Sequence, residues 1–145
     1  DGSRVSHAQV PPPIAVELGG TRSAVAMIVV DCGDAPVTLI AIEPFAHGPT
    51  GDAGAITSIA LDDAPADGRP GQAPAGHRRP VDGARLDPGQ SVAVALDVVG
   101  RAEGPFSPSA FIIRYRYRGE DNVIGFASSV WFCVGDQTCV APPTH

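Results

Sequence analysis

Three cysteines, Cys32, Cys133 and Cys139, carry the most reactive side chains of this chain. Cys133 and Cys139 enclose the sequence Val-Gly-Asp-Gln-Thr, in which Gly135 permits a tight reversal of the backbone. This spacing favours a short local disulfide between Cys133 and Cys139. Such a bond would indicate an oxidising, extracytoplasmic compartment, as in a secreted, periplasmic or cell-envelope protein. The alternative is a cytosolic protein with three reduced, partly buried thiols.

Cys32 is expected to remain outside this disulfide. If successive strands alternate in direction, Cys32 and Cys133 lie at opposite ends of the fold, whereas a disulfide needs Cα atoms within about 7 Å. A free Cys32 is either a reactive or partner-linking thiol, or a small apolar side chain beneath a turn.

The metal-binding residue types do not form a recognised site. No pair of the four histidines has a ligand spacing, and there is no Cys-x2-Cys motif. A cupredoxin-like copper site would need His and Met ligands soon after Cys133, but Met27 is the single methionine. The acidic residues Asp62, Asp63 and Asp67 do not match a calcium loop, and we interpret them as a solvated turn. The sequence predicts no metal. A periplasmic metal-binding protein resembling a copper chaperone is the alternative function.

No pattern of residues predicts catalysis. The chain has no Gly-x-Ser-x-Gly elbow and no Gly-rich phosphate loop between a strand and a helix. His47 is near Glu43 in the sequence, but no nucleophile is placed beside this pair. We therefore expect a protein that is not an enzyme and that uses no cofactor.

Length and composition limit the fold and the partners. A chain of 145 residues with 43% hydrophobic residues is expected to fold as one domain with a sizeable core. Its 17 glycines and 15 prolines favour many turns between short strands. The net charge of −6 argues against a nucleic-acid surface. No apolar run reaches the roughly 18 residues of a membrane span.

The elements that would position these residues are strands. Apolar and β-branched runs predict an edge strand at residues 14–18, a central strand at 21–30, and further strands at 37–43, 55–61, 91–98, 111–118 and 123–133. A helix is the competing interpretation of residues 21–30. Residues 1–13 are expected to be a flexible leader, residues 14–140 the folded domain, and residues 141–145 a loose tail. The whole is an all-β, Ig-like antiparallel sandwich of about seven strands.

Residues 62–80 interrupt this regular pattern. The segment is rich in Pro and Gly and has no apolar period, which predicts a long loop. Such a loop is either a contact surface or a surface insertion that the fold tolerates. By contrast, the strand predicted at residues 91–98 alternates clearly, with valines and a leucine opposite Ser, Ala and Asp, and is expected to be half-buried.

Residues 111–133 predict a hairpin around the turn Gly-Glu-Asp-Asn. In its first strand, one face carries Phe111, Ile113, Tyr115 and Tyr117, while Arg114, Arg116 and Arg118 point to water.

The aromatic residue Trp131 belongs to the second strand of this hairpin. If Ile124, Phe126, Val130 and Phe132 point inward, Trp131 points outward; a bulge at residues 128–129 would reverse this. An exposed Trp beside an arginine stripe predicts a protein contact surface made of Arg114, Arg116, Arg118 and Trp131. The alternative is that the arginine stripe is an ordinary solvated strand face with no binding role.

Two turns resemble those of bacterial Ig-like surface modules of the abnormal-spindle/hydin type. Residues 31–39, Asp-Cys-Gly-Asp-Ala-Pro-Val-Thr-Leu, are similar to the "N-x-G-x-x-P-hydrophobic" turn of these domains, with Asp31 in place of the usual Asn. Residues 86–92, Leu-Asp-Pro-Gly-Gln-Ser-Val, are similar to their "L-x-P-G-x-S-hydrophobic" turn. The resemblance implies an interaction or spacer module without catalytic residues.

Together these observations predict a non-enzymatic, extracytoplasmic interaction or structural module. The expected partner is a protein, for example within a membrane or cell-envelope complex. The chain would then be the soluble part of an anchored or assembly-associated protein. No nucleic acid is expected to bind.

Overall fold

The computed structural model describes residues 13–45, 53–63, 76, 78–107, 110–127 and 130–135. These residues form strands, turns and bends but no helix, so the all-β prediction is confirmed. The strands number eleven among the described residues rather than about seven. They are β1 (Ile14–Val16), β2 (Thr21–Val30), β3 (Val37–Phe45), β4 (Gly54–Asp63), β5 (Arg78–Arg79), β6 (Arg85–Leu86), β7 (Ser91–Gly100), β8 (Gly104–Phe106), β9 (Ala110–Tyr117), β10 (Glu120–Ala127) and β11 (Phe132–Val134).

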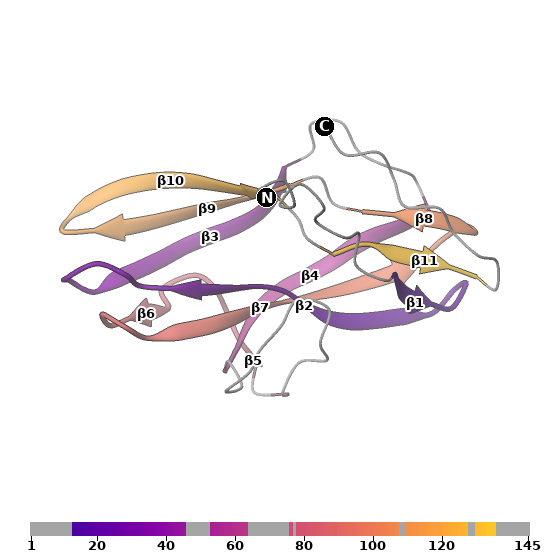
Figure 1. The fold of residues 1–145 in the computed structure, drawn as a ribbon, viewed down its shortest axis with the longest axis horizontal. Helices are drawn as coiled ribbons and strands as arrows, with labels where there is room; N and C mark the ends of the chain where they lie inside the picture. The colour runs from indigo at the N-terminus through magenta and orange to yellow at the C-terminus, as the bar shows by residue number, and fades with distance from the viewer. Residues whose placement is uncertain are drawn as a thin grey trace, which may run out of the picture.

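The strands assemble into three sheets (Figure 1). The hairpin sheet has the order β10-β9-β3-β6, and the β7 sheet has the order β2-β7-β4-β5. A small sheet, β1-β11-β8, lies at the other end of the molecule from the β9–β10 turn. All ladders between these strands are antiparallel except β1 with β11. This arrangement is consistent with a β-sandwich.

The core lies between the two larger sheets and continues into the small one. Buried residues of the hairpin sheet, such as Leu39 and Phe111, belong to the same apolar cluster as Leu96 of the β7 sheet and Phe132 of the small sheet. Burial of this apolar surface is the main term that stabilises the fold, because each large side chain removed from water contributes about 1.5–3 kcal/mol.

Two predicted strands occupy different positions from those expected. β2 has the predicted bounds, but it pairs only with β7 within the described residues and therefore forms an edge. β7 occupies a central position instead. Val94 and Leu96 face the core, and the alanines on the opposite face, Ala93 and Ala95, are also fully buried. The prediction that this strand is only half-buried is therefore wrong. The small alanines on its second face allow close packing on that face as well.

The loop predicted at residues 62–80 is partly strand. β4 extends to Asp63, and β5 pairs with it so that Arg78 faces Asp62. Asp62 is fully buried, and its Oδ2 accepts a hydrogen bond from the backbone N–H of Gly76 at 3.0 Å. Asp62 is thus a buried strand residue and not part of a solvated turn. Residues 64–75, which include Asp67, lie outside the described residues.

The predicted hairpin is confirmed, but its turn is shorter. β9 and β10 are joined by Arg118 and Gly119, both with positive φ (53° and 81°), and the closing pair is Tyr117 with Glu120. Two positive φ angles are the signature of a type I′ turn, whose twist matches that of the flanking strands.

The second hairpin strand does not continue to residue 133 as expected. β10 ends at Ala127, and β11 begins at Phe132 in a different sheet, beside β1 and β8. A single predicted strand is therefore divided between two sheets. Most of the predicted leader and all of the predicted tail, residues 141–145, lie outside the described residues, as do residues 128–129. Within the part of the chain that is described, no helix is long and apolar enough to cross a membrane.

Candidate functional site

The arginine stripe is exposed, as predicted, but each member is paired with an acid. Arg114 Nε lies 3.1 Å from Glu43 Oε1, Arg116 Nε 2.9 Å from Asp121 Oδ1, and Arg118 Nη2 2.6 Å from Asp34 Oδ1. These are surface ion pairs, each contributing at most about 1 kcal/mol. The consequence is electrostatic: the stripe does not present a net positive surface.

Asp34 joins the hairpin turn to the turn after β2. Its Oδ1 accepts hydrogen bonds from the Tyr117 hydroxyl and from Arg118, both at 2.6 Å. The pKa of Asp34 is lowered below its ordinary value, because both groups stabilise the charged carboxylate. The hydrogen bond from Tyr117 is the largest cause, and the interactions with Arg118 come next. Arg118's own hydrogen bond to Asp34 first, and then its hydrogen bond to Tyr117, raise the pKa of Arg118.

The outward orientation expected for Trp131 is wrong. Trp131 is only 7% exposed, and its neighbours Val130, Phe132 and Cys133 are also buried. The physical reason is the change of sheet: the chain leaves the hairpin sheet after Ala127, so the alternation of β10 does not extend to Trp131. The four residues predicted to form one contact face therefore do not lie together, because Trp131 directly precedes β11 in the small sheet.

Cys32 and Cys133 are far apart, as expected. Cys32 is a free, exposed thiol directly after β2, and Cys133 is buried in β11. The end of β2 and the strand β11 lie at opposite ends of the molecule (Figure 1). Cys139 lies outside the described residues, so the Cys133–Cys139 disulfide stays a prediction.

The described residues contain no group of three or more Cys, His, Asp and Glu side chains that would hold a metal ion. The four histidines, His7, His47, His77 and His145, lie outside the described residues. A copper or other metal site that used them stays a hypothesis.

The two turns that resemble those of Ig-like modules contact each other. The backbone N–H of Asp31 donates to the carbonyl oxygen of Gln90 at 3.0 Å, and the N–H of Gly89 donates to the carbonyl oxygen of Asp31 at 2.8 Å. The Asp31 side chain accepts a hydrogen bond from the Gly33 N–H at 2.9 Å through Oδ1. Asp31 therefore holds its own turn together and joins it to the turn at Gly89 and Gln90, at one end of the sandwich.

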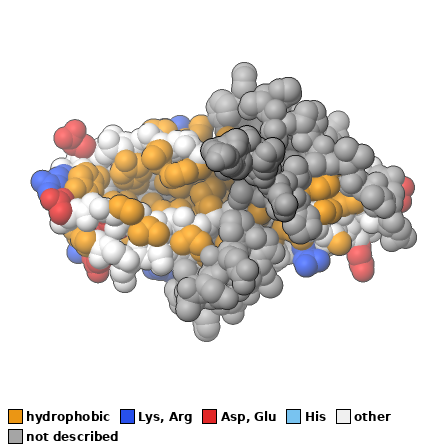
Figure 2. Space-filling model, in the orientation of Figure 1, with side chains coloured by type: hydrophobic (Ala, Val, Ile, Leu, Met, Phe, Trp, Pro, Cys, Tyr) orange, Lys and Arg blue, Asp and Glu red, His pale blue; other side chains and the backbone are white. Residues whose placement is uncertain are grey.

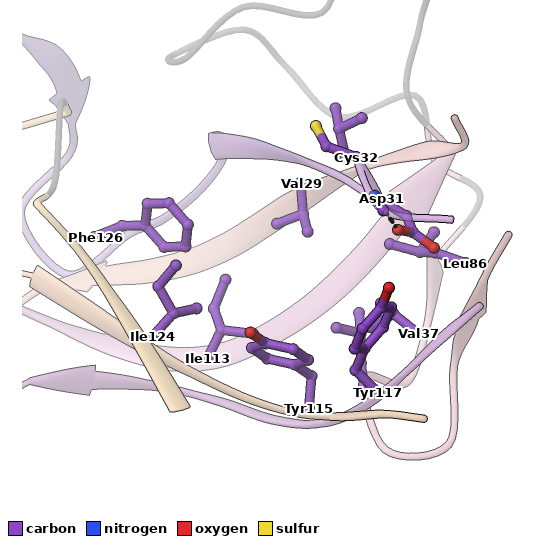
Figure 3. Close-up of a pocket in the computed structure, with 13 residues that line it drawn as sticks. Val29, Asp31, Cys32, Val37, Leu86, Ile113, Tyr115, Tyr117, Ile124 and Phe126 are labelled. Carbon is purple, nitrogen blue, oxygen red and sulfur yellow. Dashed lines mark hydrogen bonds between the residues drawn. The ribbon is translucent and has the colours of Figure 1, made fainter. Parts of the chain in front are cut away.

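A groove opens between β2 and the β9–β10 hairpin at this same end. Its volume is about 280 Å³, and apolar side chains from both sheets dominate its lining. Figure 2 shows apolar side chains gathered on this face of the molecule. Figure 3 shows Ile124 and Phe126 on β10 extending toward the space that Val29 of β2 faces. A volume of this size suits a few apolar side chains rather than a large cofactor.

The groove leaves large apolar side chains in contact with water. Val30, Ile124 and Phe126 are 47%, 42% and 41% exposed. The alternation considered in the sequence has Ile124 and Phe126 pointing inward. Both lie on the core-facing side of the hairpin, where their cross-strand partners are Ile113 and Phe111. However, no described strand lies between β10 and β2 to cover them. Alternation predicts the face of a side chain, but it does not reveal whether that face is covered.

One end of the groove is acidic. Asp31 lines the groove and is 4% exposed, yet its Oδ2 atom has no hydrogen-bond partner within the described structure. Figure 3 shows the Tyr117 hydroxyl pointing toward this carboxylate. A buried carboxylate oxygen without a donor costs at least about 1–3 kcal/mol, so this end of the groove favours a ligand that supplies a hydrogen-bond donor. In the sequence, Asp31 is no more than a departure from the usual Asn of a turn motif.

Comparison of the chain with protein-family models, curated proteins and solved structures found no match.

Proposed function

We propose that this chain is a non-enzymatic interaction module that binds a protein partner through the groove between β2 and β10. The observation that carries the proposal is the exposure of Ile124 and Phe126 over an apolar hollow of about 280 Å³. Large apolar side chains gathered at one place on a protein surface typically mark a contact site. Fold alone does not identify a function, so the proposal depends on this site.

The groove replaces the contact surface expected from the sequence. Trp131 is buried, and Arg114, Arg116 and Arg118 are each paired with an acid. Rim ion pairs of this kind contribute little to affinity and mainly affect association rates. The arginine face is therefore a secondary surface in the proposal.

We propose an extracytoplasmic location and an Ig-like kinship for the module. The location rests on the predicted Cys133–Cys139 disulfide, which needs an oxidising compartment. The kinship is supported by the docking of the turn at Asp31 on the turn at Gly89, and by two antiparallel sheets ordered β2-β7-β4 and β10-β9-β3.

Site-specific photo-crosslinking in cells that produce the protein tests this function. A benzophenone amino acid replaces Ile124 in the groove. In a matched variant it replaces Arg114, which lies on the outer face of the same hairpin. We expect a defined crosslinked protein from position 124 and none from position 114. Crosslinking from position 114 alone would restore the arginine face as the contact surface, and the absence of crosslinks from both positions would contradict the proposal.

A further inference from the structure

Among the described residues, β10 presents an open strand edge beside the groove. Within the described residues it pairs with β9 alone, so its other edge has no strand partner. The strand is eight residues long and contains neither Pro nor Lys, the residues that commonly prevent edge-to-edge pairing. Three of its apolar side chains, Val123, Ile124 and Phe126, are exposed. An edge of this kind is suited to pairing with another extended chain.

The register of the hairpin identifies the backbone groups that are free. In a hairpin with a two-residue turn, the closing pair is hydrogen-bonded, and hydrogen-bonded pairs then alternate along the ladder. The closing pair here is Tyr117 with Glu120, so Glu120, Asn122, Ile124 and Phe126 bond to β9. The N–H and C=O groups of Asp121, Val123 and Gly125 consequently point away from β9 toward the open edge.

The side chains of β10 that face the groove change in character along the strand. Glu120, Asn122, Ile124 and Phe126 lie on the face shared with the buried residues Ile113 and Phe111. The far end of this row is apolar, and the end at the turn is acidic. A strand added at this edge would place every second side chain over the groove.

The charges at the turn end favour a basic partner. The arginines there are already paired, Arg85 with Asp87, Arg116 with Asp121 and Arg118 with Asp34. Within the described residues, Glu120 has no ion pair, and the buried Oδ2 of Asp31 has no donor. The unpaired charges at this end of the groove are therefore both negative, and the whole chain carries a net charge of −6. Electrostatic complementarity selects a cationic residue at this position of the partner.

We infer that β10 accepts an extended segment of a partner protein as an added strand, with apolar residues at alternate positions and a Lys or Arg beside Glu120 and Asp31. This inference rests on the proposed function and names the chemistry of its partner. Main-chain hydrogen bonds to Asp121, Val123 and Gly125 provide affinity, and the groove selects the alternate side chains.

A synthetic peptide tests the inference on the intact protein. The probe is Lys-Thr-Val-Thr-Ile-Thr-Val-Thr-Lys, which places its apolar residues and both lysines on one face, so that a lysine lies at the turn end in either strand direction. One control peptide carries Glu in place of both lysines. The other is methylated on alternate backbone nitrogens along the edge that would pair with β10. Binding is measured by fluorescence anisotropy, and amide NMR shifts locate it. We expect the probe to shift the amides of Asp121, Val123 and Gly125. The Glu peptide should bind at least about tenfold more weakly, and the methylated peptide should not bind detectably.

Two substitutions at Val123 test the same point from the protein side. Val123→Pro removes an N–H that points to the open edge and leaves the ladder with β9 intact, a position where edge strands tolerate proline. Val123→Thr keeps the N–H and the β-branched shape. We expect Val123→Pro to weaken binding of the probe at least about tenfold and Val123→Thr to leave it within about twofold. If Val123→Pro fails to fold, the methylated peptide on the unmodified protein still decides the question.

The outcomes separate this inference from the proposed function. Equal binding of the methylated peptide would overturn strand addition while leaving the groove as a contact site. No binding of the lysine peptide, together with a crosslinked partner from position 124, would overturn the inference alone. A dimer in sedimentation analysis that Val123→Pro dissociates would also overturn it, because a second copy would then occupy the edge.

Discussion

Gly89 donates its backbone N–H to the carbonyl oxygen of Asp31 at 2.8 Å, which joins two turns that are far apart in the sequence. Gly89 has φ of 85°, and the N–H of Gln90 returns to the carbonyl oxygen of Asp87 at 2.9 Å, as in a type II turn. The positive φ of one glycine thereby sets the backbone that supports Asp31 at the acidic end of the groove.

Replacing this glycine should destabilise the protein through its backbone conformation. A Cβ at Gly89 would meet no atom within 4 Å, so crowding does not contribute to the cost. An L residue with positive φ costs about 1–2 kcal/mol, and we expect Gly89→Ala to lower the free energy of unfolding by that amount in urea denaturation.

Gly125→Ala in β10 is the matched control for this experiment. The nearest atom to a Cβ there is the carbonyl oxygen of Phe111 at 3.9 Å, and the φ of Gly125 is not in the left-handed region. This substitution should be neutral or stabilising by up to about 1 kcal/mol. A loss of stability equal to that of Gly89→Ala would show that the conformation of Gly89 is not the cause.

Asp97 should make the stability depend on pH in acid. Burial raises the pKa of Asp97, but hydrogen bonds from Ser23, Arg78 and Ser58 together with the charge of Arg78 outweigh it, so that its pKa lies below the ordinary value of 3.8. Arg78 Nη1 lies 2.9 Å and 2.8 Å from its two oxygens. A carboxylate with a lowered folded-state pKa contributes stability that is complete above its unfolded pKa of about 3.9 and is lost as the pH falls through the folded-state value.

Asp97→Asn should therefore reduce stability at pH 7 by about 1–2 kcal/mol, and the variant should lose less stability than the wild type as the pH falls below about 4. Urea denaturation across this pH range measures both effects. If the two proteins lose stability in parallel below pH 4, Asp97 is not responsible for the acid dependence.

Tyr117→Phe should raise the pKa of Asp34 toward its ordinary value. The hydroxyl of Tyr117 is the largest cause of the lowered pKa, and Phe keeps the ring while removing the donor. Carbon-detected NMR titration of the Asp34 carboxyl group measures the change. Arg118→Gln should also raise this pKa, because it removes the positive charge beside the carboxylate. An unchanged Asp34 pKa in Tyr117→Phe would contradict the assignment of the Tyr117 hydroxyl as a donor.

The three thiols should differ in reactivity. Cys32 is exposed and free, so it should react with a thiol reagent in the native protein. With the predicted Cys133–Cys139 disulfide formed, we expect about one reactive thiol in the denatured, unreduced protein and about three after reduction. Cys32→Ser should remove the native signal. Three reactive thiols without reduction would contradict the disulfide and the proposed extracytoplasmic location.

Several features of the fold follow from local sequence chemistry. Alternation correctly predicts that Phe111 and Ile113 are buried and that Arg114 and Arg116 are exposed, because side chains in a strand point to opposite faces in turn whatever the neighbours are. The turn at Pro88 and Gly89 is predicted for an equally local reason, since Pro and Gly have the φ angles that a type II turn needs.

The position of Trp131 and the openness of the groove depend on long-range pairing. The residues from 123 to 134 are strand-forming throughout, but their division between the hairpin sheet and the small sheet depends on β1 and β8, which are distant in the sequence. That division buries Trp131 and leaves Ile124 and Phe126 uncovered.

The all-β class, the faces of β9 and the turn chemistry can be read from local sequence, because each is governed by the sterics and periodicity of a few neighbouring residues. Other features emerge only in the assembled fold: among the described residues, β2 and β10 are edge strands with an apolar groove between them, and buried Asp31 at the end of this groove has one oxygen without a hydrogen-bond partner. Strand order and the accessible surface are properties of the assembled sheets, so periodicity within one strand does not encode them.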